Sequence, residues 1–224
     1  MNEITENQLS QILRSLENDL EERTIRYKKG DVLARQGDYV KKIMVIKNGT
    51  VKVYIISFDG RQYVYGFLGK GGIIGATEFL SNIKVKGNFE AMNETEIIPI
   101  PIPKFKDLLS TNHSFSIFLM KRLARDVVYT VNKVEAFGLC DVEKRLKQML
   151  QNLALSHGIK TEKGIEIALD ITHKDLGELI GAYRTTITHL LNDLRKQGYV
   201  INEGRKLIIR PPKEFYSDGD LPSI

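Results

Sequence analysis

The clearest pattern of hydrophobic and polar positions lies in residues 170–200. Thr172 precedes a short apolar-periodic run, and Asp175, three residues later, completes a weak capping box for a helix. The inward positions of this helix are Leu176, Leu179 and Ile180. Gly181 ends the run, because glycine is the residue that most often closes a helix. The pattern therefore predicts a short helix that begins after Thr172.

A second helix is predicted to begin near Ala182 or Tyr183. Its apolar residues recur at intervals of three and four and form one buried stripe, Ile187, Leu190, Leu191 and Leu194. Two short helices joined by a glycine turn form a helix-turn-helix, in which the second helix enters the major groove of DNA. The residues expected to face bases and phosphates are Thr172, Tyr183, Arg184, Thr185, Thr186, Thr188 and His189.

Helix pairs separated by glycine also occur in domains that touch no nucleic acid, so the next segment is important. Gly198 closes the second helix, residues 199–201 alternate like a strand, residues 202–205 form a turn, and residues 206–210 return. A two-stranded ribbon after a helix-turn-helix indicates a winged helix. Arg205 and Lys206, at the basic tip of the ribbon, are expected to contact phosphate without reading base sequence.

The first half of the chain has a different pattern. Residues 5–20 predict an amphipathic helix that covers the end of a barrel, with Leu9, Ile12, Leu13, Leu16 and Leu20 on one side. From Thr24 to about Ile102, short β-rich runs are separated by glycines. Asn48–Gly49 and Asp59–Gly60 are hairpin signals, because both positions of a type I′ turn need a positive φ. About eight such strands close best as a jelly roll or a small barrel.

Residues 113–137 contain no Gly or Pro and would form a helix about 37 Å long. One stripe has the spacing of a two-stranded coiled coil: Met120, Leu123, Val127, Thr130, Val134 and Phe137. A second stripe lies beside it: Ile117, Ala124, Val128 and Val131. Both stripes could be ordinary core, but the wide apolar face favours one side on the barrel and the other against a second copy. We therefore predict a homodimer, with Gly138 as a hinge before a helix at 141–154.

Composition limits the classes of protein. The 224 residues, 42% of them hydrophobic, can build two modest cores, and no segment has the length of apolar sequence that a membrane helix or signal peptide needs. We therefore expect a cytoplasmic protein without membrane partners. A single cysteine, Cys140, excludes an internal disulfide and an iron–sulfur cluster held within one chain. The net charge of +5 is compatible with DNA binding but is weak evidence for it.

Several motifs together resemble one known family. They are K-G-D-V-L-x-x-Q-G-D (29–38), V-I-K-N-G-T-V-K-V-Y (45–54), D-G-R (59–61), G-G-I-I-G (71–75) and I-T-x-x-D-L-G-x-x-x-G-x-x-R-x-T-I-x-x-L-L (171–191). In this order they resemble the CRP/FNR family of bacterial transcription regulators over roughly residues 27–209. The resemblance implies a cyclic-nucleotide-binding-like sensor domain, a long dimerisation helix and a C-terminal winged helix-turn-helix. The fold class expected is thus α+β with a jelly-roll barrel.

The resemblance also guides the interpretation of the effector site. Cyclic-nucleotide binders of this superfamily supply a Glu for the ribose and an Arg for the cyclic phosphate after the glycine motif. Here Ala76 replaces the Glu, and residues 82–91 contain lysines but no arginine, so cyclic AMP is disfavoured. A haem ligand would have to be His113 or Cys140, both at the ends of the long helix, so we expect no haem.

A small organic effector remains. The residues expected to surround it are Tyr63, Tyr65, Gly75, Ala76, Thr77, Lys84, Lys86, Asn88, Arg125 and Tyr129. Tyrosines and cations together suit an acidic aromatic ligand, which is similar to the phenolic acids that the halorespiration regulators of the family sense. The alternative is that the lysines are solvated and the tyrosines only pack the barrel.

The recognition helix departs from the family pattern. Members of the cyclic-AMP type present R-E-T-x-x-R; here Arg184 is kept, Thr185 replaces the Glu and His189 replaces the second Arg. The resemblance therefore implies an operator half-site that differs from TGTGA, with Arg184 on a guanine or a phosphate. RNA polymerase is a further candidate partner, and the sequence leaves activation and repression both open.

Two other functions fit the sequence less well. A cupin-like enzyme needs several histidines in its barrel, and residues 1–112 contain none. A cyclic-nucleotide-binding module that regulates a protein partner would not retain DNA. The favoured organisation is an effector-binding barrel at 1–112, a dimerisation helix at 113–138, a DNA-binding domain at 139–212 and a tail at 213–224, with no metal and no catalytic site.

Overall fold

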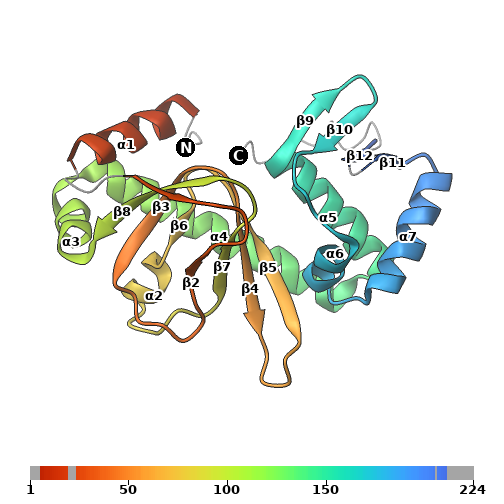
Figure 1. Ribbon diagram of the computed structural model, residues 1–224, viewed down its shortest axis with the longest axis horizontal. Helices are drawn as coiled ribbons and strands as arrows, with labels where there is room; N and C mark the ends of the chain where they lie inside the picture. The colour runs from red at the N-terminus through yellow and green to blue at the C-terminus, as the bar shows by residue number, and fades with distance from the viewer. Residues whose placement is uncertain (1–5, 20–23, 205, 211–224) are drawn as a thin grey trace. The chain divides into compact units, whose positions relative to one another are not determined.

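The chain folds into two compact units, Met1–Asn132 and Lys133–Ile224. The computed structural model describes residues 6–19, 24–204 and 206–210. The first unit combines antiparallel sheets with helices, and the second combines helices with a small sheet (Figure 1). The α+β class is confirmed. The finer division at residues 112 and 138 stays a prediction, and the tail lies outside the described residues.

The first unit is built on two antiparallel sheets, as a jelly roll requires. In the described part of the chain each has four strands, in the orders β1-β8-β3-β6 and β2-β7-β4-β5. The strands are β1 (Ile25–Tyr27), β2 (Val32–Ala34), β3 (Lys42–Asn48), β4 (Val51–Ile56), β5 (Gln62–Leu68), β6 (Ile73–Ile74), β7 (Asn88–Ala91) and β8 (Thr95–Pro101). Successive side chains of a strand point to opposite faces of the sheet. In β4, Val51 and Val53 are buried whereas Lys52 between them is not.

Of the two turns that the sequence marked as hairpins, one is a hairpin and the other is not. Asp59–Gly60 lies in the β4–β5 connection, a true hairpin, but only Gly60 has a positive φ, 81°. Asn48–Gly49 joins β3 to β4, which belong to different sheets, so it is not a hairpin. Gly49 is required there, because its φ is 95° and an added Cβ would lie 2.6 Å from Thr95 Oγ1.

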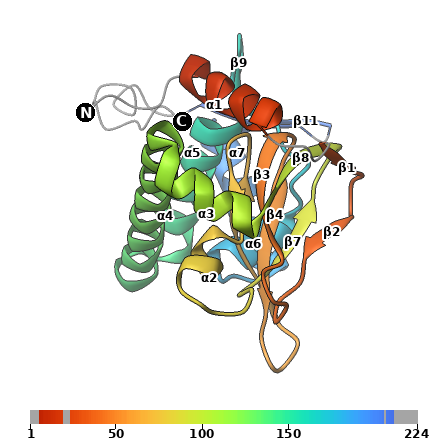
Figure 2. The ribbon, with the colours of Figure 1, turned by 90° about the vertical axis from the view of Figure 1, so that its left-hand side faces the viewer.

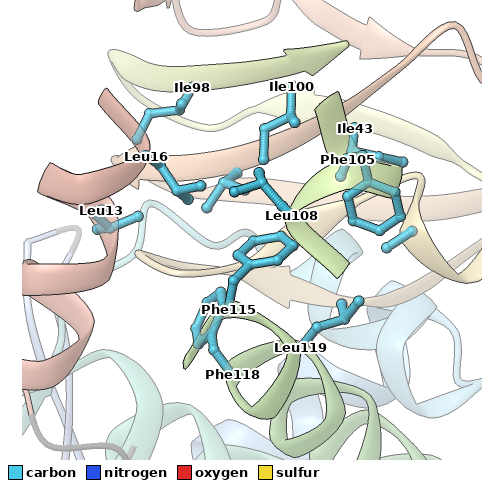
Figure 3. Close-up of a cluster of buried hydrophobic side chains, with 12 residues drawn as sticks. Leu13, Leu16, Ile43, Ile98, Ile100, Phe105, Leu108, Phe115, Phe118 and Leu119 are labelled. Atoms are coloured by element: carbon cyan, nitrogen blue, oxygen red, sulfur yellow. The ribbon is translucent and has the colours of Figure 1, made fainter. Parts of the chain in front are cut away.

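Helices cover the outer face of the β1-β8-β3-β6 sheet. They are α1 (Glu6–Asp19), α3 (Ile102–Thr111) and the start of α4 (His113–Leu139), with the short α2 (Ala76–Leu80) at the edge (Figure 2). Leu13 and Leu16 of α1 pack with the phenylalanines of α3 and α4 onto the strands (Figure 3). The predicted N-terminal helix is therefore present, but it packs on a sheet face and not on a barrel end. Leu20 lies outside the described residues.

Strand β3 contributes to two cores, which explains its continuous apolar run. Ile43 and Val45 join the cluster under the helices, whereas Met44 and Ile46 join a second cluster with residues of the other sheet. A strand buried on both faces loses the alternation of a half-exposed strand. The second cluster fills the space between the sheets and includes Val51, Val53 and Phe89.

Helix α4 is the long helix that the sequence predicted, but it does not break at Gly138. The helix continues to Leu139, and the N–H of Cys140 still donates to the carbonyl of Ala136 at 3.0 Å. The chain turns at Asp141, whose carboxylate accepts from the N–H of Lys144 at 2.8 Å and caps the next helix. The helix therefore has no break at Gly138, and a hinge there stays a prediction.

The second unit places three further helices on a small antiparallel sheet. The helices are α5 (Val142–His157), α6 (His173–Ile180) and α7 (Arg184–Lys196). The sheet has the order β11-β12-β10-β9, formed by β9 (Gly158–Thr161), β10 (Gly164–Ile167), β11 (Val200–Glu203) and β12 (Lys206–Ile209). The sequence predicted the wing strands β11 and β12 but missed β9 and β10. No helix among the described residues is long and apolar enough to cross a membrane.

Candidate nucleic-acid interface and sensor junction

Helix α6 begins at a complete capping box. The N–H of Asp175 donates to Thr172 Oγ1 at 3.1 Å, and the N–H of Thr172 donates to Asp175 Oδ2 at 3.0 Å. Both bonds satisfy groups that the first turn of a helix leaves unpaired. The Thr172 hydroxyl also donates to Asp175 Oδ2 at 2.5 Å, so it is fully engaged within the cap. The structure thus gives Thr172 a capping role, and its contact with DNA stays a prediction.

Two glycines allow the sharp turn between α6 and α7. Gly181 ends α6 with a φ of 68°, a left-handed conformation that glycine adopts without strain. Gly177, which the sequence reading did not single out, is equally constrained, because an added Cβ would lie 2.5 Å from the carbonyl oxygen of Ala182. The N–H of Ala182 donates to the carbonyl of Gly177 at 2.9 Å. The two helices are therefore locked backbone to backbone.

Helix α7 has one buried and one open side, as its periodicity predicted. Ile187, Leu191 and Leu194 are buried and Leu190 is half-buried. The other side is polar: Tyr183, Arg184, Thr185 and His189 are exposed, and Thr186 and Thr188 are half-buried. Tyr183 is 83% exposed although it is aromatic. A rigid helix therefore presents donors and an aromatic ring to solvent at its first two turns.

His173, which sequence reasoning missed, orients Thr188. The Thr188 hydroxyl donates to the carbonyl of Arg184 at 3.0 Å, and the His173 Nδ1 atom lies 2.9 Å from Thr188 Oγ1. A hydroxyl has one proton, so Nδ1 must be the donor in the second bond. Burial lowers the pKa of His173, and nearby Arg195 and Arg184 lower it further. The imidazole of His173 thus holds the Thr188 hydroxyl in place.

The wing carries less free positive charge than the sequence indicated. Lys206 Nζ lies 3.0 Å from a carboxylate oxygen of Glu166 on β10, and Lys163 forms an ion pair with Glu203. Both pairs are exposed, so salt screens them and a phosphate can compete for the lysines. Arg205 lies outside the described residues.

In the first unit, the segment after β6 supplies part of the predicted effector site. Gly75 precedes α2 with a φ of 90°, Ala76 is buried in the core beneath the helices, and Thr77 is exposed. The methyl group of Ala76 therefore contributes packing and no hydrogen bond.

The predicted cations of the effector site lie at the surface. Lys84 and Lys86 are exposed, and the ammonium of Lys84 lies 4.7 Å from the centre of the Tyr39 ring. Asn88 is buried, and its Oδ1 accepts from the N–H of Gln36 at 3.2 Å. The structure thus gives Lys84 and Asn88 partners within the protein.

The predicted tyrosines meet where β5 contacts α4. The Tyr129 hydroxyl donates to the carbonyl of Tyr65 at 3.1 Å, and their rings lie edge to face with centroids 5.8 Å apart. Burial raises the pKa of Tyr129, and burial with the neighbouring Tyr65 raises the pKa of Tyr63 to about 12. Arg125, on the same helix, is half-buried. Tyr63 and Tyr129 therefore remain neutral hydrogen-bond donors at physiological pH.

The opposite face of α4 is apolar and exposed. Val127 and Val134 are 62% and 66% exposed, and Met120, Ala124, Val128 and Val131 are also exposed. Of the predicted dimer residues, Leu123 packs on the core beneath the helices and Thr130 is hydrogen-bonded to Tyr65. Phe137 is exposed but lies against Gly181 and the guanidinium of Arg145. The predicted seam is therefore only partly on the free face.

In the part of the chain that the structure describes, no group of three His, Cys, Asp or Glu residues could hold a metal ion. His113 is exposed at the start of α4, and Cys140 is half-buried after its end.

Comparison with known protein families finds one match in each of the two units. Residues 24–112 match the cyclic nucleotide-binding domain, and residues 144–215 match the Crp-like helix-turn-helix domain. The global nitrogen regulator of Nostoc sp. is 25% identical over 178 residues, 79% of this chain and 80% of that protein. The cAMP-activated global transcriptional regulator CRP of Salmonella typhimurium is 26% identical over 186 residues, 82% of this chain and 88% of that protein. The chain belongs to the CRP/FNR family of transcription regulators.

Solved structures of CRP/FNR regulators and related proteins share the fold. The c-di-GMP-responsive regulator CLP of Xanthomonas campestris superposes with a TM-score of 0.74 at 20% identity, over 90% of this chain and 98% of that one. CprK in complex with OCPA superposes with a TM-score of 0.68 at 18% identity, over 92% of each chain. Membership of this CRP/FNR family confirms the resemblance seen in the sequence and excludes the cupin-like enzyme.

Proposed function

We propose that this CRP/FNR regulator is a homodimer that reads a palindromic DNA operator through its two α7 helices, under control of the sensor domain. The observation that carries the proposal is the two-sided α7. A stripe of Ile187, Leu191 and Leu194 fixes the helix in its domain, while Tyr183 and Arg184 stand exposed at its start. A helix held in this way can enter the major groove with its first turns against the bases.

Arg184 is our candidate for the main base contact. Its guanidinium can donate two parallel hydrogen bonds to O6 and N7 of a guanine, a contact worth about 1–3 kcal/mol of discrimination. Thr185 and His189 stand on the same open side, and Thr188 would contribute its methyl group, because its hydroxyl is engaged with His173 and Arg184. Thr186 and the wing residue Lys206 are proposed to contact the phosphate backbone.

Homodimerisation is proposed along the free face of α4. Met120, Val127 and Val134 remain in the seam as the sequence predicted, and the exposed Ala124 and Val131 replace Leu123 and Thr130. This corrected seam again steps by four and three residues, the repeat of a two-stranded coiled coil. A two-fold dimer presents two α7 recognition helices, which matches an operator with two inverted half-sites one helical turn apart.

Effector control is the third part of the proposal. The relatives include a cAMP-activated and a c-di-GMP-responsive regulator, but here Ala76 is buried core and residues 82–91 carry no arginine. A cyclic nucleotide is therefore disfavoured, and a small organic ligand at the β5–α4 junction is preferred. Lys84 and Lys86 are solvent-exposed, so a negative charge on that ligand has weaker support than the sequence suggested. Because the output is transcription, we also propose a contact with RNA polymerase and action in the bacterial cytoplasm.

Selection of duplexes from a random DNA library tests this function. The purified protein is expected to enrich an inverted repeat, and Arg184→Ala is expected to relax one symmetric position of each half-site. Lys160→Ala, which removes an exposed cation from β9, serves as the matched control and should leave the selected sequence unchanged. Failure to enrich any sequence over random DNA would rule the function out.

A further inference from the structure

Strand β5 contains a bulge at the point where it meets α4. Val53 of β4 pairs with Gly66, and the next residue of β4, Tyr54, pairs with Val64, so the pairing passes over Tyr65. A bulged residue leaves the regular ladder of backbone hydrogen bonds, so its carbonyl can accept from elsewhere. The Tyr129 hydroxyl donates to this carbonyl at 3.1 Å. Helix α4 is thus fastened to the barrel at the bulge of β5.

A second bond completes the fastening. The Thr130 hydroxyl donates to the carbonyl of Asp126 at 2.7 Å, and the hydroxyl of Tyr65 is hydrogen-bonded to the same Thr130 oxygen. Thr130 has one proton and uses it on Asp126, so Tyr65 is the donor. We call Tyr65, Tyr129 and Thr130 the tyrosine latch. Each hydroxyl in the latch has a partner that the chain itself supplies.

The latch connects α4 to the barrel interior. The Tyr65 ring packs against the core cluster between the two sheets, while its hydroxyl reaches α4. Gly66 makes room for the partner ring, because an added Cβ would lie 3.1 Å from the Tyr129 hydroxyl oxygen. A larger residue at 66 would therefore require the Tyr129 ring to move by a few tenths of an ångström.

The latch, together with Leu119 and Leu123 in the core beneath the helices, fixes the rotation of α4 about its own axis. With Tyr129 and Thr130 against β5, the residues opposite them are Ala124, Val127 and Val131, which are exposed. The alternative seam read from the sequence uses Leu123 and Thr130 in place of Ala124 and Val131. At 3.6 residues per turn the centres of the two seams differ by about 50° of rotation. Thr130 cannot form its hydrogen bond with Tyr65 and lie in the alternative seam with Leu123 at the same time.

We propose that the tyrosine latch selects the Ala124–Val131 seam for pairing of two copies without a bound effector. The inference rests on the proposed homodimer and adds how its interface is chosen. An effector that enters between β5 and α4 has to displace the Tyr65–Thr130 bond, so ligand binding and the latched seam exclude each other. Loss of the latch therefore acts as the effector does, by allowing α4 to rotate toward the Leu123 seam.

Disulfide cross-linking between copies tests the selection of the seam. In a Cys140→Ser background, a cysteine at position 131 reports the latched seam and a cysteine at 123 reports the alternative, because only seam residues bring two Cα atoms within about 7 Å. The rate ratio of Val131→Cys to Leu123→Cys is measured with the latch intact and with Tyr65→Phe. Tyr27→Phe is the matched control, since Tyr27 is half-buried on the same core cluster but lies on β1.

With the latch intact, position 131 is expected to cross-link about tenfold faster than position 123, the ratio that one hydrogen bond can maintain. Tyr65→Phe should lower the ratio several-fold, and Tyr27→Phe should not change it. An unchanged ratio in Tyr65→Phe, or faster cross-linking at 123 in the intact protein, overturns the latch. Thr130→Val provides a second disruption if Tyr65→Phe does not fold. A protein that is monomeric at every concentration would contradict the homodimer instead, which light scattering distinguishes.

Discussion

Replacing Gly177 by alanine is expected to destabilise the DNA-binding unit although it improves the intrinsic helix propensity of α6. Alanine within a helix gains up to about 1 kcal/mol over glycine. The added Cβ, however, would lie 2.5 Å from the carbonyl oxygen of Ala182. That oxygen belongs to backbone held by the 2.9 Å bond between the Ala182 N–H and the Gly177 carbonyl, so it cannot move aside alone.

The clash outweighs the gain in propensity. A carbon and an oxygen in contact need more than 3 Å, so α7 would have to shift from α6 by more than half an ångström. Overpacking of this kind costs about 1–3 kcal/mol, and a backbone clash lies near the upper value. The net loss expected is about 2 kcal/mol, or roughly 10 °C in the melting temperature of a unit of this size. The shift of α7 should also weaken operator binding.

The assay compares two identical substitutions in different surroundings. Gly138→Ala lies in α4 with no atom within 4 Å of the added Cβ, so it should be neutral or stabilising by up to about 1 kcal/mol. Thermal unfolding and operator affinity are measured for both variants. If Gly177→Ala melts as high as the wild-type protein and binds the operator as tightly, the packing described for α6 and α7 is wrong.

Four further predictions concern the fold and the site. Arg184→Ala should weaken operator binding by about 1–3 kcal/mol in a titration against the selected duplex, and an equal loss on unrelated DNA would assign Arg184 to phosphate. Thr172→Ala should lower the stability of the DNA-binding unit by about 1 kcal/mol while Thr172→Ser should not, as measured by denaturant unfolding; equal losses would argue against the cap. Val131→Lys should yield monomers in light scattering, because it places like charges across the seam. Burial lowers the pKa of His157 from 6.5 to about 4, so the stability it contributes is present above pH 6.5 and is lost as the pH falls toward 4. Melting temperatures of wild type and His157→Gln over this range should converge at low pH, and parallel curves would contradict this role.

Much of the DNA-binding unit could be predicted from the sequence, because local signals determine it. Thr172 with Asp175 marks a helix start, Gly181 marks its end, and Ile187 with Leu191 marks the buried side of α7. Each signal acts over a few residues, so it survives without knowledge of the fold. The strands β9 and β10 have four residues each, like the predicted β11 and β12, but no helix-turn-helix precedes them to mark them as a ribbon.

Features that depend on distant parts of the chain were predicted less well. Periodicity showed two apolar stripes on α4 but could not decide which one faces the barrel, because the choice depends on Tyr65, more than sixty residues earlier in the chain. Likewise, the sequence did not show that the ammonium of Lys84 lies over the ring of Tyr39, which is 45 residues earlier in the chain. Asn48–Gly49 has the composition of a hairpin turn, but the strands on either side pair with other partners.

The most direct test of the proposed regulator is the mass of its complex with the selected duplex. Native mass spectrometry at rising protein concentration should show two chains on one duplex that carries both half-sites. A duplex in which one half-site is scrambled should lose most of the affinity and should not hold the pair at the same concentration. A complex with one chain per duplex, or equal binding to scrambled DNA, would contradict a dimer that reads a palindromic operator.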